Sequence, residues 1–82
     1  MQQHSTRSFL AQNIKRLRAE RAWSQEDLAL EAGLHRTFVA HVERCVRNIS
    51  LDNIDKLACA LGTTASALLA DPRRTGNTNT ET

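Results

Sequence analysis

Residues 25–44 read QEDLALEAGLHRTFVAHVER, and this stretch decides the fold. Two helix-length segments, 25–32 and 36–44, stand on either side of a connection of three residues. Ser24 precedes the first segment as an N-cap and has an acidic capping-box partner three residues later. Gly33 follows that segment, where a tight helix exit requires a left-handed backbone. A connection this short predicts two helices that cross steeply.

The flanking sequence carries helix signals of the same kind. Leu10, Ile14 and Leu17 have the i, i+4, i+7 spacing of one buried helix face. Ser50 and Thr64 are N-cap candidates for two later helices. No segment alternates with the period of two that a strand requires. The sequence therefore predicts an all-α, compact five-helix domain, with helices from Thr6 or Ser8 to Arg21 and over residues 25–32, 36–44, 51–61 and 65–70.

Length and composition bound the organisation of the chain. Its 82 residues are expected to form one domain over residues 8–70, with a disordered or frayed N-terminus at 1–7 and a disordered polar tail at 71–82. No apolar run approaches the roughly 18 residues of a membrane span, and the first residues are too polar for a signal peptide. The two cysteines, without secretory context, indicate reduced thiols, and burial is the expectation for Cys59. These features indicate a cytoplasmic protein.

Charge is unevenly distributed along the chain, although the net charge is only +2. Residues 1–23 carry +4, residues 24–34 carry −3, and residues 35–48 carry +2. A fold that brings the two basic segments together would create one positive face, which is a feature of nucleic-acid-binding proteins.

The two central helices meet the requirements of a helix-turn-helix. Ala29 is small where the helices approach most closely, and the positions that must point inward are apolar. The outward face of the second helix then contains Arg36, Thr37, Ala40, His41 and Arg44. The N-terminal end of such a helix enters a major groove, where Arg36 can bond to guanine O6 and N7, and Thr37 or His41 can bond to a base edge.

Other polar residues are expected to hold the DNA backbone. Gln25 lies in the first turn of its helix, where the helix N-terminus favours a phosphate. Arg44, Arg47 and Asn48 follow the recognition helix, where the chain leaves the groove. The first helix offers Arg18, together with Lys15 and Arg16, as outer contacts.

Two residues of the central helices have a structural alternative. Phe38 either packs against the body of the domain or reaches a thymine methyl group. Glu43 is expected to be structural and to pair with a nearby arginine, because a carboxylate facing phosphates would repel them.

Taken together, Ser24–Ala29, Gly33–Val39, Val42–Arg44 and Arg47–Ser50 resemble the Cro/phage-repressor class of helix-turn-helix regulators, the XRE-type family. The chain is especially similar to the small controller proteins of restriction–modification systems, and the resemblance covers about residues 8–70.

The resemblance implies a DNA-binding transcriptional regulator encoded by a bacterium or a phage. Relatives contact DNA at the positions that here hold Gln25, Arg36, Thr37, Phe38, Ala40, His41, Arg44 and Arg47. Family members of this size are usually symmetric dimers joined through the last two helices, which implies an interface at Leu51, Asp55, Leu68 and Leu69. The chain departs from its relatives at Cys45, where they often have Gly or Asn, and at Ala40 and His41, positions that vary and tune the base sequence.

The expected partners are therefore double-stranded DNA and a second copy of the chain. A homodimer would place two recognition helices in successive major grooves about 34 Å apart, on a pseudo-palindromic operator. RNA polymerase is a further candidate partner, since the bound dimer would block or touch it.

Other function classes have less support. The chain has no Gly-rich phosphate loop and no Ser/His/Asp set on a plausible scaffold, so neither an enzyme nor a cofactor is expected. His41 and Cys45 have i, i+4 spacing, but no third ligand lies nearby in the sequence, so no metal site is expected. The remaining alternative is an antitoxin-like or other protein-interaction module that uses the same fold.

Overall fold

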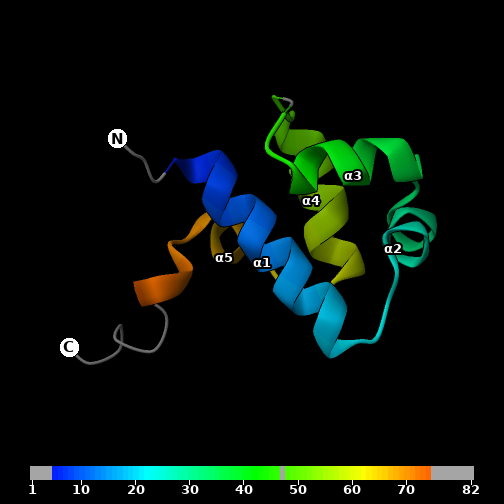
Figure 1. The fold of residues 1–82 in the computed structure, drawn as a ribbon, viewed down its shortest axis with the longest axis horizontal. Coiled ribbons are helices and arrows are strands. Elements are labelled where there is room, and N and C mark those ends of the chain that lie inside the picture. Colours follow the sequence, from blue (N-terminus) through cyan, green and yellow to red (C-terminus); the bar gives the residue numbers. More distant parts are fainter. Residues whose placement is uncertain (1–4, 47, 75–82) are drawn as a thin grey trace.

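The computed structural model describes residues 5–46 and 48–74. Within these residues the chain forms α-helices and one short 3-10 helix, with no strand: α1 (Thr6–Glu20), α2 (Gln25–Ala32), α3 (Arg36–Glu43), α4 (Leu51–Ala60), α5 (Ala65–Leu69) and η1 (Pro72–Arg74). In Figure 1, α1 crosses the middle of the molecule, with α2 and α3 toward one end and α5 and η1 toward the other. The prediction of an all-α, five-helix domain is confirmed.

Local hydrogen bonds set the start of each of four helices. The side chains of Ser5, Ser24, Ser50 and Thr64 each accept a backbone N–H from the residue three positions later. At α2 the capping box is complete, because the Asp27 carboxylate also accepts from the Ser24 backbone N–H at 2.9 Å. Such caps satisfy N–H groups that a helix leaves without an internal partner.

The core lies where the helices meet. Its fully buried members are aliphatic: Leu10, Ile14, Leu28, Val39, Leu57, Leu61 and Leu68 are each at most 2% exposed. All three predicted members of the α1 stripe belong to it or pack against it. Among the helices in the described part of the chain, none is long and apolar enough to cross a membrane.

A buried asparagine joins α1 to α5. Asn13 is 1% exposed, and its Nδ2 donates to the carbonyl oxygens of Leu68 at 2.8 Å and Ala70 at 2.9 Å. These carbonyls lie at the end of α5, where a helix has no partners of its own for them. The sequence pattern gave no indication of this contact, because its two sides are more than fifty residues apart.

The structure adds detail at the ends of the domain and corrects one expectation about its surface. Ser5 caps α1, which begins at Thr6, the earlier of the two predicted starts, and Pro72–Arg74 form η1, which packs against α1. The expected disorder at residues 1–4 and 75–82 lies outside the described residues. Cys59 is exposed on α4 rather than buried, because it lies on the face opposite the core positions Leu57 and Ala58.

Candidate nucleic-acid interface

The turn between α2 and α3 is held by both backbone and packing. Gly33 has φ +73°, and the next residue, Leu34, donates its backbone N–H to the Ala29 carbonyl at 2.9 Å. Ala29 itself is 3% exposed, as its small size at the helix crossing predicts. On the α3 side, Val39 and Val42 are buried. The orientation of α3 relative to α2 is therefore fixed by the core.

This packing leaves one face of α3 at the surface. Arg36 and Thr37 are exposed in its first turn, and Arg44 is exposed at its C-cap. Ala40 and His41 lie between them and are half-buried. Four of the expected base-reading residues, Arg36, Thr37, Ala40 and His41, thus lie on one strip of α3, with Arg36 at one end and Arg44 at the other.

Phe38 and Arg36, on or near this strip, also have contacts within the protein. Phe38 is half-buried and packs against the core, which favours the structural reading of this residue. Arg36 has an ion pair with Glu26 of α2, with Nη1 and Oε1 3.6 Å apart and both side chains about 70% exposed. An exposed pair at this distance contributes about 0–1 kcal/mol, so it does not prevent Arg36 from bonding to a base.

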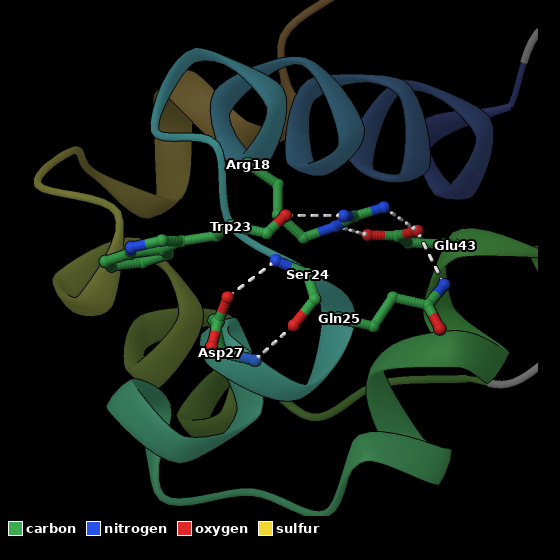
Figure 2. Close-up of polar contacts among 6 residues, drawn as sticks. All are labelled: Arg18, Trp23, Ser24, Gln25, Asp27 and Glu43. Carbon is green, nitrogen blue, oxygen red and sulfur yellow. Dashed lines mark hydrogen bonds and ion pairs between the residues drawn. The ribbon is translucent and has the colours of Figure 1, made fainter.

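Glu43, at the end of α3, accepts hydrogen bonds from two other helices (Figure 2). Its side chain is only 4% exposed, and Arg18 of α1 binds it through Nε at 2.7 Å and Nη2 at 2.9 Å. Gln25, the first residue of α2, donates from Nε2 to Glu43 Oε1 at 2.9 Å. The expectation that Glu43 pairs with an arginine is confirmed.

This arrangement engages Arg18, from which a phosphate contact was expected, in hydrogen bonds within the protein. Its third nitrogen, Nη1, donates to the Trp23 carbonyl at 2.8 Å, so each of the three guanidinium nitrogens has an acceptor within the protein. The hydrogen bond to Glu43 raises the pKa of Arg18, with a smaller contribution from the negative charge, against the effect of burial. Because the pKa is raised in the folded state, the stability that Arg18 protonation contributes is lost only as the pH rises above the ordinary arginine value.

The chain leaves α3 through a left-handed residue. Cys45 has φ +62°, a conformation that favours Gly or Asn, which are the residues expected there from the resemblance. Its thiol is exposed, with Sγ 3.7 Å from the Arg7 carbonyl oxygen. Asn48 is exposed beyond this turn, and Arg47 lies outside the described residues.

The residues expected at a dimer interface do not all reach the surface. Leu51 is 73% exposed and Asp55 is exposed, both on α4, and Leu69 is half-buried. Leu68 is 0% exposed because its side chain lies inside the core of this chain, so it is not available to a partner. This corrects the expectation for Leu68.

An apolar hollow of about 370 Å³ lies beside these residues. It is lined by α1, the segment before α4, α4 itself and α5, through Thr6, Arg7, Leu10, Asn48, Ile49, Ile54 and Leu69. Within residues 5–46 and 48–74, no three His, Cys, Asp or Glu side chains gather closely enough to hold a metal ion.

Comparison with known proteins identifies the family. A helix-turn-helix family model matches residues 14–68. A hypothetical transcription factor from Neisseria meningitidis is 49% identical over 67 residues, which are 82% of this chain and 63% of that protein. Control protein C.BamHI from Bacillus amyloliquefaciens is 42% identical over 67 residues, covering 80% of this chain and 83% of the relative.

A solved structure shows the same fold with DNA present. The restriction–modification controller protein C.Esp1396I, as a tetramer in complex with its natural 35 base-pair operator, has a TM-score of 0.72 and 27% identity, over 80% of this chain and 87% of that chain. The matched family consists of transcription regulators rather than enzymes. The chain belongs to the helix-turn-helix family of transcriptional regulators, of the Cro and phage-repressor (XRE) type.

Proposed function

We propose that this protein binds double-stranded DNA sequence-specifically as a homodimer on a pseudo-palindromic operator, as a controller of the restriction–modification type. The observation that carries the proposal is the exposed strip of α3, on which Arg36 and Thr37 project from the N-terminal turn of a helix fixed by the core. This is the end of a recognition helix that reaches base edges. The similarity to C.BamHI and to the operator-bound C.Esp1396I supports the same reading.

The proposed contacts divide into two groups. Arg36 and Thr37 read bases, His41 lies one turn further along the same helix, and the Ala40 methyl group contacts a thymine methyl group. Gln25, Arg44, Asn48 and Arg47 contact phosphates and set the register of the protein on the duplex.

The proposed dimer interface is centred on Leu51. Leu51 is 73% exposed, and its neighbours Ile49 and Ile54 line the apolar hollow that also includes Leu69. Covering this surface with a second copy would remove it from water, and apolar burial drives most protein association. Asp55 lies on the exposed side of the same helix. The bound dimer then alters transcription in the bacterial cytoplasm by blocking or contacting RNA polymerase, depending on where the operator lies.

The proposal is tested by selection from a pool of random duplexes at about 150 mM salt, a concentration at which non-specific electrostatic binding is weak. We expect enrichment of a palindrome whose half-sites lie about one helical turn apart. Weak, salt-sensitive binding without enrichment would contradict it and would favour a protein-interaction module instead.

A further inference from the structure

The Glu43 carboxylate is a buried acceptor shared by α1 and α2. Its two oxygens accept two hydrogen bonds from Arg18 and one from Gln25 (Figure 2). Each of these distances is below 3.0 Å, and the carboxylate is nearly inaccessible to water. The end of α3 is thereby connected to the start of α2 by a side chain, in addition to the turn that joins the two helices.

The charge of Glu43 determines how the Gln25 amide is oriented. An ionised carboxylate only accepts hydrogen bonds, so the amide must turn its nitrogen toward it. One N–H of Gln25 Nε2 is used by this bond. The second N–H remains, and the amide cannot rotate without breaking the first bond. An amide without such a partner turns freely and can present its oxygen, which repels an anion.

The place of Gln25 makes this orientation relevant to DNA. It is the first residue of α2, at the positive end of the helix dipole, and it is half-buried beside α3. A donor fixed there is ready for a phosphate oxygen before DNA arrives, so less side-chain freedom is lost on binding.

We propose that Glu43 is a positioning residue for DNA binding, which holds the Gln25 amide as a phosphate donor at a fixed place relative to the base-reading helix. This inference rests on the proposed function. It gives Glu43 a second role besides joining helices, although Glu43 itself does not touch DNA.

The two roles are separable by replacing the ion pair as a unit. The double variant Arg18→Met/Glu43→Leu removes both charges and leaves neither of them buried alone, and such exchanges often preserve stability. Gln25→Ala is then introduced into the wild type and into this double variant. Binding of all four proteins to the selected duplex is measured over a range of salt concentrations, at a temperature where circular dichroism shows each to be folded.

In the wild type we expect Gln25→Ala to weaken binding by about tenfold for each half-site, because each protomer loses one hydrogen bond to a charged group. The slope of log K against log salt should stay nearly unchanged, because the Gln25 amide is uncharged and its loss does not alter the number of phosphate charges that the protein neutralises. In the double variant the amide is no longer held, and Gln25→Ala should change the affinity by less than about twofold. A change of that size is no larger than the deviation from additivity seen for independent sites.

Ile14→Val serves as the control, because it lowers stability by removing one buried methyl group without changing a charge or the surface. Its affinity per folded molecule should equal that of the wild type. An equal effect of Gln25→Ala in both backgrounds, or no effect in the wild type, would overturn the positioning role while the proposed function stands. Failure of the wild type to select any sequence would overturn both.

Discussion

At the scale of single residues, Ala22 follows the C-cap of α1 in a backbone conformation that is unfavourable for alanine. Its φ is +58°, in the left-handed region, where a Cβ costs about 1–2 kcal/mol. Glycine removes this strain but adds about 0.4–1 kcal/mol of freedom to the unfolded chain. We therefore expect Ala22→Gly to raise the free energy of unfolding by about 0.5–1 kcal/mol, measured by urea denaturation. The control Ala19→Gly, inside α1, should lower it by about 1 kcal/mol. A loss at both positions would contradict the expectation.

A second residue-scale prediction separates base reading from phosphate binding. Arg36→Ala should cost about 1–3 kcal/mol on the selected duplex and relax specificity at one base pair per half-site, with little effect on random DNA. Arg44→Ala, at the other end of α3, should weaken binding to both duplexes and flatten the salt dependence, because phosphates are alike in every sequence. Equal losses for Arg36→Ala on selected and random DNA would contradict its assigned role.

At the scale of the helices, the Arg18–Glu43 pair joins α1 to α3 over 25 residues of sequence. Glu43→Ala would leave the Arg18 charge in a partly buried site without its partner, and breaking a buried pair in this way costs about 3–5 kcal/mol. We expect a loss of this size in urea denaturation, and recovery of most of it in Arg18→Met/Glu43→Leu. A loss below about 1 kcal/mol in Glu43→Ala would show that the pair behaves like an exposed one.

The helices themselves were largely predictable, with ends that differ by one or two residues. α2 has the predicted bounds, and α4 and α5 end one residue earlier than expected. Caps at Ser24, Ser50 and Thr64 act over three residues, so the sequence alone shows them. The end of α1 was less clear, because alanine rather than glycine takes the left-handed position there.

At the scale of the whole molecule, the dimer proposal makes Leu51 the residue to change. Leu51→Arg would place a charge on the proposed interface, and we expect a monomer by sedimentation, with a corresponding loss of operator affinity. Leu30→Arg is the matched control, since Leu30 is 79% exposed but lies on α2. The oligomeric state of the control should not change. A dimer that persists in Leu51→Arg would place the interface elsewhere.

The sequence by itself determined the helix pattern, the short turn at Gly33 and the exposed strip with Arg36 and Thr37. These features depend on residues within one or two helical turns of one another, so their physical causes are visible in a linear pattern.

Only the tertiary structure decided which side chains are used inside the protein. Arg18 was expected to bind a phosphate, but it pairs with Glu43. Leu68 was expected at a dimer interface, but it lies in the core. The sequence did not single out Asn13, which binds the end of α5. Their partners or neighbours come from distant parts of the chain. Whether a cation meets a carboxylate or solvent depends on how helices pack, because burial, rather than residue type, sets the cost of leaving a charge or carbonyl unpaired.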